Sequence, residues 1–358
     1  MSKSKNKLKA VDFFCGGGGM SYGMKKAGIK VLAGIDNDSN CEETYKANIK
    51  GAEFINADVF DLKEQELQET LKLEQNDDNL LLIGCSPCQF WSIINTDKEK
   101  SKKSANLLIE FERFVKYFNP GYVVVENVPG VLRRKKESGL EDFINWLEEN
   151  NYKVHFKVHN TSDYKVPQNR KRFTLVANRV TDVEIEPVLG RGKKLTVRDA
   201  IGEHNGFPKL HAGNKDPENR NTVAGLEPIC IERMQYIKKD GGSRFDFAHI
   251  PRLQLDCFIG RDSSFRDTFG RLWWDRPSST ITTKFYAVSN GRFTHPEEDR
   301  ALSLGEGAAL QSFPKDYKFH GTSIANIARL IGNAVPPEYA RRIGLALKKN
   351  HINKLNTT

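Results

Sequence analysis

Short apolar segments alternate with helix-forming segments through the first 180 residues, and most of the apolar segments end in glycine or polar residues. The apolar segments are Leu8–Phe14, Val31–Ile35, Glu53–Ile55, Asn79–Gly84, Tyr122–Val125, Tyr152–Val158 and Arg172–Asn178. The helix-forming segments between them include Met20–Ala27, Leu62–Leu73, Leu107–Phe118 and Leu140–Asn150. This alternation predicts an α/β fold with a mostly parallel, doubly wound sheet.

The alternation stops near Val180. From there to about Arg300 the chain is rich in Gly, Pro, Arg and aromatic residues, and helical segments return only at Leu304–Gln311 and Ile324–Lys349. We therefore predict a large domain built from residues 1–182 and 301–358, and a smaller, irregular domain over residues 183–300.

The composition is that of an ordinary globular protein, with 38% hydrophobic and 28% charged residues. No apolar run approaches the roughly 18 residues of a membrane helix, and the basic N-terminus lacks the apolar stretch of a signal peptide. We expect a cytoplasmic protein with no membrane partner. The net charge of +9, and the arginines interleaved with Phe and Trp over Arg244–Arg292, favour a polyanionic partner.

The six cysteines are spread along the chain, which predicts reduced thiols in this compartment. Cys85 and Cys88 form a Cys-x-x-Cys pair, but Cys230 and Cys257 are too far apart to supply the second pair of a zinc site. We therefore expect no bound metal.

Gly84-Cys85-Ser86-Pro87-Cys88-Gln89 follows a buried apolar strand and contains a proline, which cannot continue a sheet ladder. The chain must turn where the strand ends, at the edge where open α/β sheets bind ligands. Cys88 lies on this turn and is a candidate nucleophile. An unpaired cysteine taken alone is more often a small buried hydrophobic residue, so the neighbouring motifs decide between the two.

The glycine-rich turn Cys15–Gly19 lets a ligand approach the backbone at a helix N-terminus. The next strand ends in Asp36, whose carboxylate can accept both hydroxyls of a ribose. Asp58 ends the third strand and can bind an adenine amino group, and Phe14 can pack near that base. As a set, these residues predict an adenosine pocket for a dinucleotide or for S-adenosylmethionine; separately, they would be helix caps and turn carboxylates.

Glu126 follows a short apolar strand, and a half-buried carboxyl group that holds a proton at neutral pH suits general acid catalysis. Arg170 and Arg172 stand two residues apart at the start of a strand, so we expect both on one face. With Cys88 they form a candidate catalytic cluster. Taken singly, Glu126 would cap a turn and the arginines would form surface salt bridges.

The order of these motifs resembles that of the DNA cytosine-5 methyltransferases over nearly the whole chain. The similar motifs are Asp12–Gly19, Ser86–Gln89 (Pro-Cys-Gln), Glu126–Val128 (Glu-Asn-Val), Gln168–Arg172 (Gln-x-Arg-x-Arg), Gln311–Pro314 and Gly332–Pro337. The resemblance implies a Rossmann-like S-adenosylmethionine-dependent methyltransferase fold, with a smaller target-recognition domain and double-stranded DNA as partner.

Carried over residue by residue, the resemblance implies that the Cys88 thiolate attacks carbon 6 of a cytosine while Glu126 binds ring nitrogen 3 and the exocyclic amine. Arg172 would hold the carbonyl oxygen, and Arg170 would help to place the nucleophile and the base. The base would flip out of the duplex. The implied cofactor-binding residues are Phe14, Gly16, Gly18, Gly19, Asp36, Asn37, Asp58, Val59, Pro87, Leu107 and Asn333.

Two positions depart from the family pattern. Asn37 stands where an aromatic residue often covers the adenine, so that side of the cofactor would be held more loosely. Lys102-Lys103-Ser104-Ala105 replaces an Arg-Gly pair in the loop after Cys88, so phosphate contacts there would depend on lysines.

A tRNA cytosine-5 methyltransferase of the same fold is an alternative. Those relatives carry Cys-Phe-Thr in the target region, and Cys257-Phe258-Ile259 matches only in part. The residues that follow resemble a DNA-reading surface: Arg261, Arg266, Arg271 and Trp273-Trp274.

A catalytically silent DNA-binding homologue is the second alternative. It would be expected to lack the nucleophile or the glutamate, and this chain has both Cys88 and Glu126. For the enzyme we expect a monomer associated with the nucleoid. A cognate restriction endonuclease, if the chain belongs to a restriction–modification system, would act separately.

Overall fold

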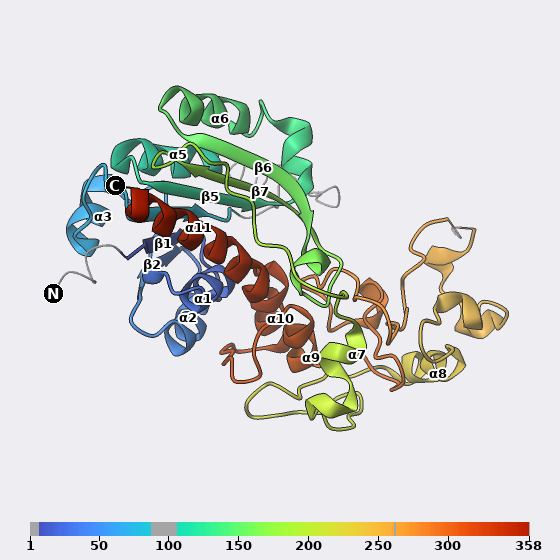
Figure 1. Cartoon of the computed structure of the whole chain (residues 1–358). Helices are drawn as coiled ribbons and strands as arrows, with labels where there is room; N and C mark the ends of the chain where they lie inside the picture. Colours follow the sequence, from blue (N-terminus) through green and yellow to red (C-terminus); the bar gives the residue numbers. More distant parts are fainter. Residues whose placement is uncertain (1–6, 87–105, 261–262, 358) are drawn as a thin grey trace. The chain divides into compact units, whose positions relative to one another are not determined.

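The computed structural model describes residues 7–86, 106–260 and 263–357 (Figure 1). The chain divides into two compact units. Unit 1 comprises Met1–Tyr164, Lys171–Gly190 and Val335–Thr358, and unit 2 comprises Lys165–Arg170 and Arg191–Ala334. The second unit therefore reaches further toward the C-terminus than the predicted boundary at residue 300, and it also takes in a short stretch before β7.

Unit 1 is built on a seven-stranded sheet of order β3-β2-β1-β4-β5-β7-β6. The strands are β1 (Lys9–Phe13), β2 (Lys30–Asp36), β3 (Glu53–Asn56), β4 (Leu80–Gly84), β5 (Tyr122–Asn127), β6 (Lys153–Asn160) and β7 (Lys171–Asn178). All pairs are parallel except those of β7 with β5 and β6. The predicted α/β fold with a mostly parallel sheet is confirmed.

Helices cover both faces of this sheet (Figure 1). They are α1 (Gly19–Lys26), α2 (Glu42–Asn48), α3 (Glu64–Leu71), α5 (Leu107–Phe118), α6 (Leu140–Glu149) and α11 (Pro337–Thr357). On one face, Leu67, Phe111 and Leu147 from α3, α5 and α6 pack in a core with Val11 of β1. No described helix is both long enough and apolar enough to span a bilayer.

The predicted helix over Ile324–Lys349 is wrong, since the segment forms two helices. The first is α10 (Ile324–Asn333), and the second is α11, which begins at Pro337. Ala334 between them is extended, with ψ 146°. Pro336 and Pro337 lack backbone N–H groups and disfavour helical geometry in the residue before them, while proline fits the first turn of a new helix.

Unit 2 contains α7 (Val197–Ile201), α8 (Pro228–Tyr236), α9 (Leu304–Leu310), α10 and short 3₁₀ turns. Among its described residues, β-structure is limited to isolated β-bridges, and there is no β-strand. One of its cores packs α8 against the loops that follow and includes Met234, Phe247, Phe269 and Val288. The irregularity expected of this part of the chain is therefore present.

The expectation that Arg271 reads DNA is wrong. Its side chain is completely buried, and its guanidinium donates to the backbone oxygens of Met234, Ile237 and His295. Without strand ladders, buried backbone oxygens need other donors, and this arginine supplies them. Arg266 is exposed, whereas Arg261 lies outside the described residues.

A buried ion pair links α9 to the segment before it. The guanidinium of Arg300 donates to both carboxylate oxygens of Glu306 at 2.7 and 2.8 Å, and neither side chain is exposed. Burial alone would raise the pKa of Glu306, but the hydrogen bonds and charge of Arg300 outweigh it and lower that pKa. Glu306 also accepts from the Ser303 backbone N–H in a capping box that begins α9.

Glu306→Gln should lower the free energy of unfolding by about 3–5 kcal/mol, because it leaves the Arg300 guanidinium buried without its carboxylate. Urea denaturation of the full chain measures this. Asp275→Asn is the control, since its 74% exposed side chain pairs with the 50% exposed Arg198 at the surface, and it should cost far less. Equal losses in the two variants would contradict this interpretation.

Candidate active site at the carboxyl ends of the strands

The strand order reverses at β1, which lies between β2 and β4. The chain leaves β1 toward α1, and the N–H of Cys15 donates to the backbone oxygen of Ile35 at 3.1 Å. On the other side, the N–H of Cys85 donates to the oxygen of Phe13 at 3.3 Å. Ligands of open α/β sheets bind outside the carboxyl ends at such a reversal.

The turn after β1 bends through left-handed conformations. Phe14, Gly16 and Gly18 have φ angles of 61°, 50° and 90°. A Cβ placed on Gly16 would meet no atom of the described residues within 4 Å, so the described residues leave the space beside this turn empty. Gly18 caps α1 without a side-chain hydrogen bond, and Gly19 begins the helix. This backbone can approach a ligand closely.

Asp36 ends β2 beside this turn. Its Oδ2 accepts from the Gly16 N–H at 2.8 Å, and its Oδ1 accepts from the Asp38 N–H at 3.0 Å. Each carboxylate oxygen has more than one acceptor position, so this arrangement orients the carboxylate and leaves it able to accept ribose hydroxyls. The side chain of Asn37 is exposed. The open turn and the oriented carboxylate thus fit an adenosine-containing ligand.

The remaining candidate cofactor residues of unit 1 follow β3 or begin α5. The Asp58 carboxylate accepts a hydrogen bond from the Phe60 N–H at 3.2 Å, a contact within its own turn. Val59 is buried, and Leu107 packs against the same core at the first turn of α5. These side chains supply an apolar surface next to a polar edge.

A buried polar group behind the turn was missed by sequence reasoning. Ser21 of α1 donates its hydroxyl to Asp12 of β1 at 2.6 Å and lies 2.9 Å from the Tyr45 hydroxyl. All three side chains are fully buried. A Cβ on Gly34 would lie 2.4 Å from the Tyr45 ring, so glycine makes room for this contact. Burial raises the pKa of Asp12 to about 7.

Glu126 and Arg172 form a buried ion pair on neighbouring strands. The Nε of Arg172 lies 3.1 Å from a carboxylate oxygen of Glu126, and the side chains are 12% and 6% exposed. Glu126 belongs to β5, which runs two residues further than the predicted strand end. The next residue, Asn127, donates to the buried Ser86 hydroxyl at 3.1 Å and so ties β5 to the start of the Pro-Cys-Gln segment.

Arg170 has different partners from Arg172, although sequence spacing predicted one face for both. Arg170 is buried in unit 2, where it donates to the backbone oxygens of Ile281, Gly332 and Ala334 at 3.0 to 3.2 Å. It therefore anchors the end of α10 to another loop. The candidate residue Asn333 is the last residue of α10, and its side chain is exposed.

Gln168, two residues before Arg170, begins a matched motif but was given no role from the sequence. It is fully buried, donates to the Gln311 side chain at 2.8 Å and accepts from the Ile281 N–H at 2.8 Å. Gln311 in turn donates to the oxygen of Ile331 at 2.7 Å. Two of the matched motifs thus meet through their glutamines, a contact that their positions in the sequence could not indicate.

The candidate nucleophile Cys88 and the candidate cofactor residue Pro87 lie outside the described residues. Cys85, which stands before them, is half-buried.

Comparison with known proteins places the chain in a family. The sequence pattern of the C-5 cytosine-specific DNA methylases matches residues 8–349. The chain is 34% identical over 344 residues to the type II methylase M.HgiDII of Herpetosiphon aurantiacus, covering 95% of this chain and 94% of that protein. It is 31% identical to the type II methyltransferase M1.HphI of Haemophilus parahaemolyticus, covering 97% and 88%.

The fold agrees with that assignment. A crystal structure from an E. coli prophage, described as a DNA modification methyltransferase, superposes with a TM-score of 0.70 at 23% identity, covering 97% of this chain and 100% of that one. The protein belongs to the C-5 cytosine-specific DNA methylase family. It is a DNA cytosine-5 methyltransferase, as the motifs indicated.

Asp12→Asn should flatten the pH dependence of stability. The raised pKa means that the folded chain holds the Asp12 proton more tightly than the unfolded chain. This contribution is complete below the unfolded value of 3.8 and is lost as the pH rises through about 7. The melting temperature of Asp12→Asn minus that of the wild type should therefore rise across this range. With the exposed Asp142→Asn the difference should stay constant, and a constant difference for Asp12→Asn would refute the assignment.

Proposed function

We propose that this enzyme transfers a methyl group from S-adenosylmethionine to carbon 5 of a flipped-out cytosine within a specific duplex DNA sequence. Cys88 is the nucleophile in this proposal, and the enzyme is the modification partner of a separate restriction endonuclease. The family match over residues 8–349 carries the proposal. The type II methylases among its relatives support the restriction–modification role.

The chemistry begins at carbon 6 of the cytosine. The Cys88 thiolate adds there, and the electron pair of the 5,6 double bond moves toward carbon 5. Glu126 binds nitrogen 3 and the exocyclic amine, where charge changes during the addition. Arg172 holds the Glu126 carboxylate from the adjacent strand and binds the carbonyl oxygen of the base. Carbon 5 would then take the methyl group from the sulfonium of S-adenosylmethionine, which would leave as the neutral thioether S-adenosylhomocysteine. Transfer of the carbon 5 proton to solvent and departure of the Cys88 thiolate would restore the aromatic ring.

S-adenosylmethionine supplies an electrophilic methyl group. The residues proposed to hold it are Phe14, Gly16, Gly18, Gly19, Asp36, Asn37, Asp58, Val59, Pro87, Leu107 and Asn333. Of these, Gly16 and Asp36 fit best, because the turn is open and the carboxylate is already oriented toward it. Arg170 acts as a positioning residue. Its guanidinium already donates to the backbone oxygens of Gly332 and Ala334, in the motif Gly332–Pro337.

Unit 2 is proposed to read the DNA sequence. Base edges in a duplex are read by a few side chains on a basic surface, and the exposed Arg266 is a candidate whereas the buried Arg271 is not. The tRNA alternative has less support, because the family match is to DNA methylases and Cys257-Phe258-Ile259 lacks the threonine.

Cys88→Ser should abolish methyl transfer while DNA binding survives, because a hydroxyl forms far less anion than a thiol at neutral pH. A duplex carrying 5-fluorocytosine at the target should trap the wild type covalently, since fluorine does not leave as a proton does. Cys85→Ser is the matched control and should be active and trapped. Mapping the adduct to Cys85, or near-normal turnover of Cys88→Ser, would overturn the nucleophile assignment.

Asp36→Ala should weaken S-adenosylmethionine binding by about 1–3 kcal/mol, because ribose hydroxyls lose their acceptor. Asp58→Ala should act similarly through the adenine. Isothermal calorimetry on the full chain measures both affinities. The exposed Asp61→Ala removes the same charge nearby and should leave the affinity unchanged. Unchanged affinity in Asp36→Ala would contradict the proposed pocket.

A further inference from the structure

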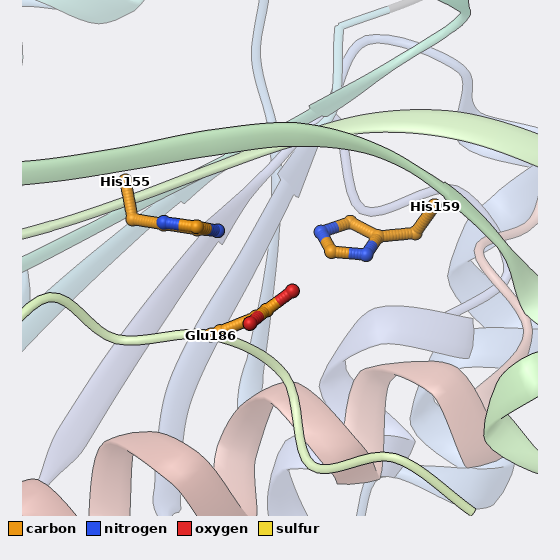
Figure 2. A group of neighbouring side chains, drawn as sticks. All are labelled: His155, His159 and Glu186. Carbon is orange, nitrogen blue, oxygen red and sulfur yellow. The ribbon is translucent and has the colours of Figure 1, made fainter.

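Three potential metal ligands that are not among the proposed cofactor and catalytic residues converge beside β6, where His159 pairs with Arg172 of β7. His155 and His159 belong to β6, and Glu186 lies on the segment that follows β7. One ligand atom from each lies within 4.8 Å of those of the other two. Figure 2 shows the two imidazole rings pointing toward one another, with the Glu186 carboxylate between them. All three residues belong to unit 1.

The strand itself places the two histidines on one face. Side chains alternate along a strand, so His155, Lys157 and His159 share a face of β6. β6 is the last strand of the sheet and pairs only with β7 in the described sheet. The segment that carries Glu184 and Glu186 supplies two contacts to this strand, one to His155 and one to Lys157.

Hydrogen bonds orient both rings. The Nδ1 of His155 lies 3.0 Å from a Glu184 oxygen, and because a carboxylate only accepts, Nδ1 is the donor and Nε2 is the nitrogen left to bind a metal. The Nδ1 of His159 lies 2.5 Å from the Tyr164 hydroxyl. The Nε2 atoms of both rings are buried without a hydrogen-bond partner among the described residues.

The state of the rings suits metal binding. A histidine whose second nitrogen is hydrogen-bonded to a carboxylate is the usual arrangement around a bound metal, since the bond fixes the ring and its tautomer. His155 and Glu184 have this arrangement.

We propose that His155, His159 and Glu186 bind a divalent transition-metal ion, with Zn²⁺ as the ion that two imidazoles and a carboxylate suit best. Water would complete the coordination. Ligands of a tetrahedral Zn²⁺ lie about 3.4 Å apart, given bonds of about 2.1 Å. Since the ligand atoms lie up to 4.8 Å apart, the side chains need to close by up to about 1.4 Å, and the 46% exposed Glu186 side chain is able to move. The expectation of no bound metal considered only cysteines, and this proposal departs from it.

Lys157 is the charge that opposes binding. Its ammonium lies 3.0 Å from one oxygen of Glu186, which leaves the second carboxylate oxygen for the ion. Both side chains are about half exposed, at 59% and 46%, so solvent weakens their attraction. Lys157→Met should therefore tighten metal binding by removing both the repulsion and the competing contact.

The bound ion would fasten the segment of Glu184 and Glu186 to the edge strand β6. This segment continues along the chain to Arg191, where unit 2 resumes. Since the ion binds the folded chain, it should raise the free energy of unfolding by RT ln(1 + c/Kd), where c is the ion concentration, and the melting temperature should rise with the logarithm of c above Kd. The proposed role is structural, and it does not depend on the proposed methyl transfer.

Co²⁺ titration of the full, tag-free chain after treatment with a chelator tests the site. We expect one equivalent to bind, with visible ligand-field bands and no thiolate charge-transfer band, and Zn²⁺ to displace it. His155→Gln and Glu186→Gln, which alter partly exposed side chains, should each weaken binding at least tenfold. His211→Gln, at an exposed histidine elsewhere, should bind as the wild type does.

Further variants separate a real site from general affinity for metal. Glu184→Ala removes only the carboxylate behind His155 and should weaken Co²⁺ binding by about tenfold or more. Circular dichroism shows whether each variant is folded. The proposal is overturned if the His155→Gln and Glu186→Gln chains, shown to be folded, bind Co²⁺ as tightly as the wild type. It is also overturned if the bound Co²⁺ shows thiolate bands.

Discussion

The reversal of strand order at β1 is the constraint on which the rest of unit 1 depends. Because β2 and β4 lie on opposite sides of β1, the turns after β1 and β4 leave the same edge of the sheet in different directions. The glycine-rich turn fills one side, and Asp36 at the end of β2 holds it through the Gly16 N–H. Residues 20 positions apart in the sequence are thus joined in one proposed binding surface.

The same edge brings the proposed catalytic carboxylate into place. Glu126 pairs with Thr174 of β7, and β4 pairs with β5 up to the preceding residue, Val125, so the direction of the Glu126 side chain is set by the sheet. Arg172 on β7 compensates the buried negative charge of Glu126. Asn127 donates a hydrogen bond to Ser86, which starts the Pro-Cys-Gln segment. A carboxylate fixed in this way is oriented before a base arrives, which is how preorganised electrostatic stabilisation works.

Arginine has a second role in unit 2. With isolated bridges in place of strand ladders among its described residues, many backbone oxygens need other donors. Arg170, Arg271 and Arg292 each donate to two or more of them from buried positions. Part of the positive charge that favours a nucleic acid partner therefore stabilises the fold, and only the exposed remainder is available to DNA.

The sequence alone determined the alternation of strands and helices, the parallel sheet and the family, because periodicity and motif spacing are local properties. Asp36 and Glu126 could be proposed as site residues from the sequence because a polar residue at a strand end is itself a local signal. The separate partners of Arg170 and Arg172, the Asp12–Ser21–Tyr45 group and the His155–His159–Glu186 cluster emerged only in the tertiary structure. Each depends on burial and on contacts between distant segments, and neither property can be read from residue spacing.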